Sequence, residues 1–137
     1  MNIYPSIICA DPLNLEKELE ILVENGVKTL HIDLMDGCFV PRYGFFPEIL
    51  PIITQRFNLT FDVHCMVSNK ELITNYLLEL KNISNISLHL NDDINATCCL
   101  FDKIKSKRIK TTAVVDLYTP PELVSSITIG GYVDNIM

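Results

Sequence analysis

The amino-acid sequence predicts an α/β fold: an incomplete (β/α)8 barrel, the TIM-barrel architecture, with about six strands in one truncated domain over residues 1–137. Strand-like and helical patterns alternate along the chain, and a βα unit recurs about every 25 residues. Two of the strand-like runs are polar on one face and apolar on the other. No GxGxxG or GxxxxGK motif follows the first run, which argues against the usual dinucleotide and P-loop folds.

Each predicted element rests on a short local pattern. The strand-like runs begin near Ile3, Thr29, Thr60, Ile86, Thr111 and Tyr132. The first helix is predicted between Asp11, a candidate N-cap, and Gly26, a typical stop, with Pro12 in its first turn. Its apolar residues recur at helical spacing, and they are Leu15, Leu19, Leu22 and Val23.

Four further helices are predicted between the later strands. A short one is expected around the sequence PEILPIITQ. The next follows a capping box from Ser68 to Glu71, and the last opens with a second capping box from Thr119 to Glu122. The fourth helix of the chain has an apolar stripe at Ile94, Cys98, Phe101 and Ile104. This alternation favours a parallel sheet with right-handed crossovers.

The faces of the strands decide between an open sheet and a barrel. One side of the second run carries Thr29, His31, Asp33 and Met35, and the other carries Leu30, Ile32 and Leu34. The third run repeats the division, with Asp62, His64 and Met66 opposite Phe61, Val63 and Cys65. Helices cover both faces of an open parallel sheet, so both faces should then be apolar. Polar residues on one face of neighbouring strands favour the inside of a barrel, near its C-terminal mouth.

Composition and charge exclude several classes of function. The chain has a net charge of −6, with 48% hydrophobic residues, and such an acidic balance argues against a nucleic-acid or anionic-membrane partner. No stretch approaches the roughly 18–20 apolar residues of a membrane span, and the start MNIYPSIICA does not resemble a signal peptide. The five cysteines lie mostly in apolar runs, which predicts reduced core thiols in a cytoplasmic protein.

Three side chains on the predicted inner face form a candidate metal site. His31 and Asp33 are two residues apart on one strand, and His64 lies at a similar height on the next. Two imidazoles and a carboxylate suit Zn²⁺ or Fe²⁺ and leave positions open for substrate oxygens. A buried His–Asp hydrogen bond with a second core histidine is the structural alternative, and the spacing leaves both open. His89 is expected to bond a backbone carbonyl, and Asp36 to form a turn before Gly37.

Four motifs make the chain resemble the ribulose-phosphate 3-epimerase family from residue 3 to the end. The most specific is HIDLMDGCFVP, residues 31–41, which is similar to the signature of the family's second strand. PSIICAD, residues 5–11, resembles the first-strand motif, and DVHCMV, residues 62–67, resembles the third-strand motif. DLYTP, residues 116–120, is a looser match to an Asn-Pro-x-Thr-Pro turn. The resemblance implies a ribulose-phosphate-binding type of (β/α)8 barrel.

The resemblance also implies roles for particular residues. The metal ligands would be His31, Asp33 and His64, together with an aspartate from the family's seventh strand. Asp33 would also be one of two acid/base groups. The substrate-binding positions would be Ser6, His64, Met35 and Met66. The cofactor would be a divalent metal, Zn²⁺ or Fe²⁺ first, with Mn²⁺ or Co²⁺ as alternatives.

The implied reaction is the metal-dependent 3-epimerisation of a ketopentose phosphate, D-ribulose 5-phosphate to D-xylulose 5-phosphate, by proton transfer through an enediolate. The expected partners are a small sugar phosphate and further copies of the chain in a homo-oligomer, with no nucleic acid and no membrane. The chain ends at Met137, before the family's seventh-strand aspartate and its phosphate-binding loops. We therefore expect impaired turnover from this chain alone.

Several positions depart from the family pattern. Cys38 stands where the family usually has histidine, Arg42 where it has asparagine, and Asn91 where it has an acid. The following loop, RYGFFPE, also lacks the family's glycine placement. Two alternatives stay open on this basis. One is an epimerase for a ketohexose phosphate such as allulose 6-phosphate, and the other is a non-catalytic metal-binding remnant.

Overall fold

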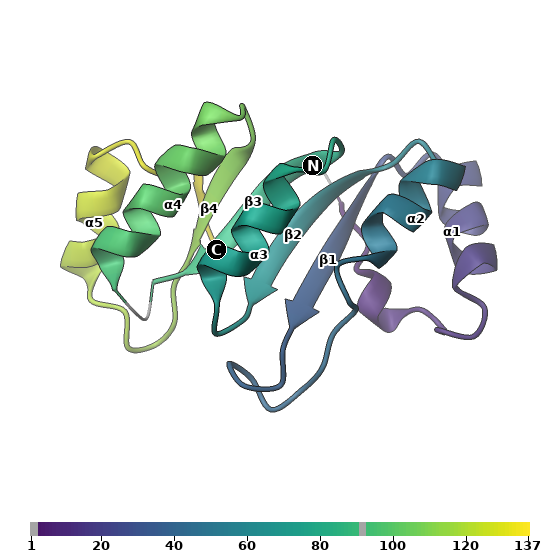
Figure 1. The fold of residues 1–137 in the computed structure, drawn as a ribbon, viewed down its shortest axis with the longest axis horizontal. Helices are drawn as coiled ribbons and strands as arrows, with labels where there is room; N and C mark the ends of the chain where they lie inside the picture. The colour runs from purple at the N-terminus through teal and green to yellow at the C-terminus, as the bar shows by residue number, and fades with distance from the viewer. Residues whose placement is uncertain (1–2, 91–92) are drawn as a thin grey trace.

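One parallel sheet organises the chain in the computed structural model, which describes residues 3–90 and 93–137. Its five strands are β1 (Thr29–Met35), β2 (Thr60–Met66), β3 (Ile83–His89), β4 (Lys110–Val114) and β5 (Asn135–Ile136). They follow one another in chain order across the sheet, from β1 to β5 (Figure 1). A doubly wound sheet reverses its strand order at a switch point, whereas a (β/α)8 barrel continues in one direction. The order therefore supports the predicted partial barrel.

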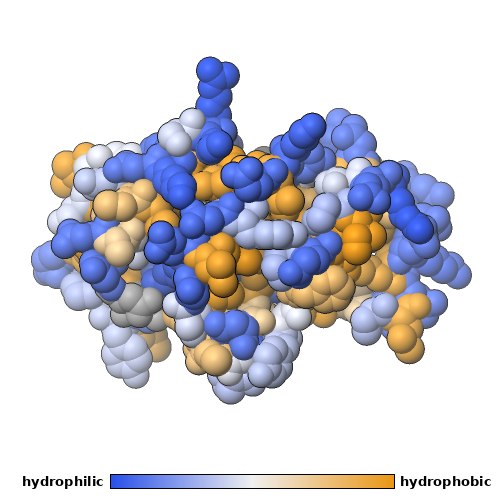
Figure 2. Space-filling model, in the orientation of Figure 1, coloured by the Kyte–Doolittle hydropathy of each residue, from blue (hydrophilic) through white to orange (hydrophobic). Residues whose placement is uncertain are grey.

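The helices lie between consecutive strands in the chain. They are α1 (Leu15–Glu24), α2 (Ile49–Arg56), α3 (Lys70–Leu78), α4 (Ile94–Ser106) and α5 (Pro121–Ile129), preceded by a short 3-10 helix, η1 (Ile7–Cys9). In Figure 1, α2, α3 and α4 lie on the viewer's side of the sheet. Right-handed crossovers between sequential strands place the connecting helices on the same side of a sheet. Figure 2 shows hydrophilic residues over this helical side, with hydrophobic residues between them.

The core lies between the helices and the sheet. The strand residues that face the helices are at most 2% exposed, and they are Leu30, Ile32, Leu34, Phe61, Val63, Cys65, Ile86, Leu88 and Ala113. Helix residues such as Leu50, Leu77 and Phe101 are fully buried in the same cluster. Burying each large apolar side chain contributes about 1.5–3 kcal/mol, so this layer fixes which face of the sheet turns outward. The predicted division of the second and third runs into two faces is confirmed.

The first predicted strand, near Ile3, is not a strand in the structure. The segment touches the sheet through a single parallel bridge between Ser6 and His31, and the Pro5 carbonyl accepts a hydrogen bond from the His31 N–H (2.9 Å). Pro5 has no N–H to donate, and Ser6 then caps η1 by accepting from the Ile8 N–H. The prediction of about six strands was therefore one too high for the described residues.

Two helices begin at a different residue from the one predicted. Asp11 does not cap α1. Its carboxylate accepts hydrogen bonds from the backbone N–H of Leu13 (3.0 Å) and from the side-chain Nδ2 of Asn14 (2.6 Å), in a turn before the helix. Asn14 occupies the N-cap position of α1. Asn69 caps α3 by accepting from the Leu72 N–H (2.9 Å), so the predicted capping box at Ser68 was also wrong.

The predicted capping box of the last helix was wrong as well. The hydroxyl of Thr119 donates to the Asp116 carboxylate (3.0 Å) and accepts from the Asp116 N–H (3.0 Å). It is thus committed to the turn before the helix, and Pro120 takes the N-cap position without a side-chain bond.

The cysteines correct a further expectation. All five are free, but Cys9, Cys38 and Cys99 are exposed and Cys98 is half-buried. Cys65 is the buried one, and burial raises its pKa to about 12. The prediction of core thiols therefore holds for Cys65 alone. Among the described residues, no helix has the length and apolar character needed to cross a membrane. Asn91 lies outside the described residues, and a single domain over 1–137 stays a prediction.

Candidate metal centre on the inner face

The register of the sheet brings the predicted site residues together. On the face opposite the helices, Asp33 of β1 pairs with His64 of β2, and His31 lies two residues before Asp33 on the same face of β1. Side chains of paired residues in a parallel sheet point to the same side, so both histidines reach toward Asp33. At the carboxyl ends of the same strands, Met35 pairs with Met66. The predicted metal-ligand and methionine positions therefore share one wall.

Two of the three candidate ligands, His31 and His64, converge on one carboxylate oxygen of the third, Asp33. Oδ1 of Asp33 lies 3.3 Å from Nε2 of His31 and 3.5 Å from Nδ1 of His64. One ligand atom from each residue lies within 4.8 Å of the others, and all three side chains are half-buried. Imidazole and carboxylate donors at this separation suit Zn²⁺ or Fe²⁺, with further positions open. The three residues could therefore hold a divalent metal ion.

Ser6 reaches the other oxygen of the same carboxylate. Its hydroxyl donates to Oδ2 of Asp33 at 2.7 Å, although the two residues lie 27 positions apart. The single parallel bridge between Ser6 and His31 places the Ser6 backbone beside β1, within reach of Asp33. Ser6 therefore holds Asp33 in one orientation, with Oδ1 turned toward the two histidines.

The electrostatics of the cluster follow from these contacts. Hydrogen bonds from His31, His64 and Ser6 hold the pKa of Asp33 well below its usual range. Hydrogen bonds to Asp33 and then Asp62 raise the pKa of His31 to about 9. At neutral pH and without a metal, Asp33 is thus a carboxylate anion and His31 is a positively charged imidazolium. A divalent cation at this place would displace that proton and supply the positive charge beside Asp33 in its stead.

Two residues that the sequence analysis did not place in the site contact its histidines. Oδ2 of Asp62 lies 2.8 Å from Nδ1 of His31, and Nε2 of His89 lies 2.9 Å from Nε2 of His64. The rings of His64 and His89 are stacked, with centroids 5.0 Å apart. The period-2 alternation already put Asp62 on the polar face, which was the available signal. The expected backbone-carbonyl partner of His89 stays a prediction.

The chain matches one protein family over nearly its whole length. The model of the ribulose-phosphate 3 epimerase family covers residues 2–137. The chain belongs to the ribulose-phosphate 3-epimerase family. The inference from the residues and the predicted partial TIM barrel are thereby confirmed, since the family has this fold.

Curated relatives give the same assignment. The chain is 34% identical over 122 residues to a ribulose-phosphate 3-epimerase of Helicobacter pylori, covering 89% of this chain and 54% of the relative. It is 29% identical to the enzyme of that name from Treponema pallidum, covering 90% of this chain and 56% of the relative. The corresponding enzyme of Methanocaldococcus jannaschii is also 29% identical, with 93% and 53% covered. The chain thus spans about half the length of these relatives. Their names do not favour the ketohexose alternative.

The loop after β1 of this epimerase-family chain is tied to the next βα unit. Oδ1 of Asp36 accepts from the N–H groups of Cys38 (2.9 Å) and Phe39 (2.8 Å), and Oδ2 accepts from the Ser68 N–H (2.6 Å). Gly37 has a φ of 76°, a backbone conformation that residues with a side chain rarely adopt. The predicted turn role of Asp36 is confirmed, and these backbone bonds lower its pKa to about 2.

We expect Asp36→Asn to destabilise the protein at neutral pH, because its amide would face the Ser68 N–H, donor against donor. The folded pKa of Asp36 lies below its ordinary value, so its stabilising effect is complete above pH 3.8 and is lost as the pH falls through about 2. The difference in urea midpoint between wild type and Asp36→Asn should therefore shrink over this window. The exposed Asp102→Asn on α4 is the control. A difference that stays constant down to pH 2 would contradict this role.

Gly44 marks the place where the same loop presses on β1. Its N–H donates to the Met35 carbonyl (3.1 Å). A Cβ at this position would lie 2.4 Å from the Asp33 carbonyl oxygen and 2.9 Å from the Met35 nitrogen. Both contacts are with backbone, so the loop or the strand would have to move.

We therefore expect Gly44→Ala to cost about 1–3 kcal/mol of unfolding free energy, the usual range for overpacking. It should also weaken metal binding, because the displaced strand carries Asp33. Arg42→Ala, an exposed change in the same loop, should stay within about 0.5 kcal/mol of wild type. Urea unfolding and Zn²⁺ titration measure the two effects. Equal behaviour of the two variants would show that the loop adapts without moving β1.

Proposed function

We propose that this chain carries the metal-binding wall of an enzyme that catalyses metal-dependent 3-epimerisation of a ketopentose phosphate, interconverting D-ribulose 5-phosphate and D-xylulose 5-phosphate. One observation supports the proposal above the others. An ionised carboxylate, Asp33, lies between two imidazoles with its second oxygen fixed by Ser6, on the inner face of a chain from the epimerase family.

We propose that His31, Asp33 and His64 hold the metal, and that Zn²⁺ or Fe²⁺ fits this donor set best. Bound there, a divalent cation would supply positive charge to the substrate's C2 and C3 oxygens and so stabilise an enediolate. The fourth ligand and the second acid/base group of the family's reaction are not assigned to residues of this chain.

Asp33 is the proposed acid/base group. Its pKa is held well below the usual range, so Asp33 is ionised at neutral pH, and the ionised carboxylate is the form that can accept the C3 proton of the substrate. Ser6 holds the carboxylate through its hydrogen bond to Oδ2. We propose that Ser6 also contacts the substrate. Met35 and Met66 are proposed to pack against the reacting carbons, where apolar thioethers keep water from the carbanion.

Proton exchange tests this function most directly. The chain is incubated with Zn²⁺ or Fe²⁺ and D-ribulose 5-phosphate in D₂O, and the C3 proton is followed by NMR. Deuterium at C3 in wild type and its loss in Asp33→Asn would support the assignment, even without accumulation of D-xylulose 5-phosphate. No exchange by a metal-loaded wild type would contradict it. A homo-oligomer stays part of the proposal, and light scattering of the purified chain decides it.

A further inference from the structure

Asp62 is a buried acid on the inner face of the sheet, and each of its two carboxylate oxygens contacts a side chain of a neighbouring strand. The residue is 8% exposed, and it pairs with His31 on β1 and with Asn85 on β3 in the strand register. Its Oδ2 lies 2.8 Å from Nδ1 of His31, and its Oδ1 accepts from Nδ2 of Asn85 at 2.6 Å. A buried carboxylate without partners is costly, so these two contacts define how Asp62 is held.

The orientation of Asn85 is itself fixed by its neighbours. The Thr112 hydroxyl of β4 donates to Oδ1 of Asn85 at 2.9 Å. Nδ2 of Asn85 donates to Ser87 as well as to Asp62, at 3.1 Å and 2.6 Å. A carboxamide has one accepting end and one donating end, so Thr112 at the oxygen turns the nitrogen toward Asp62. Three strands thus contribute to one ordered set of donors and acceptors behind His31.

We propose that Asp62, held by Asn85 and Thr112, is a positioning residue that keeps a proton on Nδ1 of His31 and so directs Nε2 toward a divalent cation. Both ring nitrogens of His31 face a carboxylate, Nδ1 facing Asp62 and Nε2 facing Asp33. When a cation takes the lone pair of Nε2, the remaining ring proton lies on Nδ1, where Asp62 can only accept it. Carboxylates placed behind a metal-binding histidine fix its tautomer and raise its basicity in this way. The proposal rests on the proposed function in taking His31 as a ligand.

An exchange of two side chains separates orientation from simple loss of packing. In Asp62→Asn, the new amide cannot accept from both His31 and Asn85. Its oxygen would satisfy one of them, and its NH₂ group would face a donor on the other side. In the double variant Asp62→Asn with Asn85→Asp, the new amide accepts from His31 and donates to the carboxylate introduced on β3. That carboxylate also accepts from Thr112, so each of these three contacts again joins a donor to an acceptor.

The experiment measures Zn²⁺ affinity by competition with a chromogenic chelator. Asp62→Asn should weaken binding about 10–100-fold, and the double variant should recover most of it. Thr112→Val, which removes the bond that orients Asn85, should cost about 2–10-fold, the effect of one hydrogen bond. Thr60→Val is the matched control on the same face of β2, because its hydroxyl pairs with Thr29 and with a backbone carbonyl. It should leave affinity unchanged.

Imidazole nitrogen NMR of the metal-free protein gives a second, independent readout. The chain has only three histidines, and above the pKa of about 9 the His31 ring is neutral. Because Asp33 also accepts at Nε2, the expected result is a relative one: Asp62→Asn should move the His31 proton from Nδ1 toward Nε2 compared with wild type, and the double variant should move it back. An Asp62→Asn variant with both the tautomer and the Zn²⁺ affinity of wild type, or a double variant that binds Zn²⁺ as weakly as Asp62→Asn, would overturn the proposal. A wild type that binds no Zn²⁺ would refute the proposed metal site, while the tautomer would still decide the role of Asp62.

Discussion

Replacing His31 by alanine is expected to lower the affinity for Zn²⁺ or Fe²⁺ by more than about 100-fold, since even partners outside the ligand set cost about 10–100-fold. The change removes one of the three candidate ligands, and one of the two imidazoles that lie against Oδ1 of Asp33. It also leaves Asp62 without its 2.8 Å contact. Metal content after dialysis, together with a chelator titration, measures the loss.

A second substitution at this position separates metal loss from misfolding. The amide of glutamine in His31→Gln can still donate to Asp62 but lacks an imidazole, so the fold should be retained while binding stays weak. Thr29→Val, two residues earlier on the same face, should bind metal as wild type does. Unchanged metal content in His31→Ala would count against both the catalytic and the non-catalytic metal-binding interpretations of this chain.

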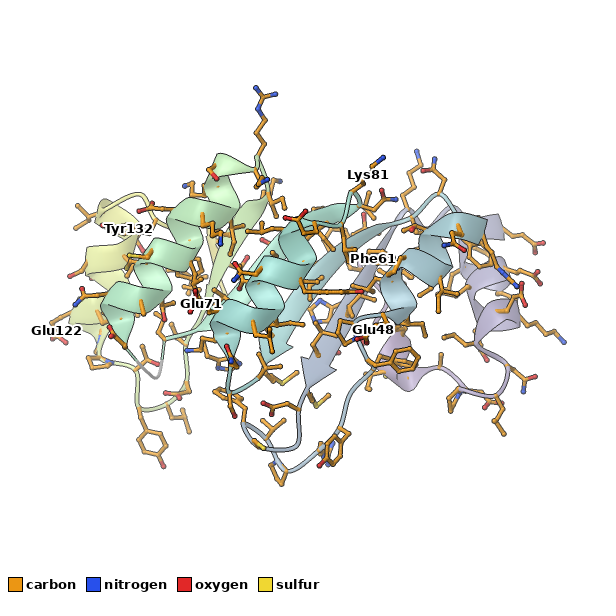
Figure 3. The ribbon with its side chains drawn as sticks, in the orientation of Figure 1. Glu48, Phe61, Glu71, Lys81, Glu122 and Tyr132 are labelled. Carbon is orange, nitrogen blue, oxygen red and sulfur yellow. The ribbon has the colours of Figure 1, made fainter. Side chains whose placement is uncertain are left out.

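Phe61→Ala should give the largest loss of stability, about 3–5 kcal/mol in unfolding free energy. Phe61 is 1% exposed on the helix-facing side of β2, and Figure 3 labels it beside α2. Truncation removes both its buried surface and its contacts with the surrounding core. The hydrogen-bonded strands around it cannot move far enough to fill the cavity that is left.

Urea unfolding of Phe61→Ala measures this loss, and an exposed apolar residue provides the matched control. Leu72 on α3 is 69% exposed, so Leu72→Ala should change the unfolding free energy by no more than about 0.5 kcal/mol. Similar losses for the two variants would mean that β2 is not packed against the helices as the structure has it.

The sequence predicted what depends on local geometry. Successive side chains of any strand point to opposite faces, so the placement of His31, Asp33 and His64 on one polar face followed from spacing alone. The same rule put the apolar residues of β1 and β2 against the helices. The alternation of strand and helix indicated a parallel sheet with right-handed crossovers. The polar face of two neighbouring strands then favoured a barrel over an open sheet.

The helix starts depended on competition that local patterns do not contain. Ser68 has the right spacing for a capping box, but its N–H is taken by Asp36 from 32 residues away, and the adjacent Asn69 caps α3 instead. Thr119 is likewise committed to Asp116. The first strand was overcounted because Pro5 supplies an acceptor but no donor, so a single bridge forms before the chain turns into η1.

The sequence by itself determined the family, the polar inner face and the three candidate ligands. Only the tertiary structure decided what surrounds them, because register between strands is set by packing of the whole sheet rather than by any one strand. His31 and Asp62 are 31 positions apart and Asp62 and Asn85 are 23 positions apart, so no local pattern indicates these contacts. The ordered hydrogen bonds behind His31 therefore arise when β1, β2, β3 and β4 align.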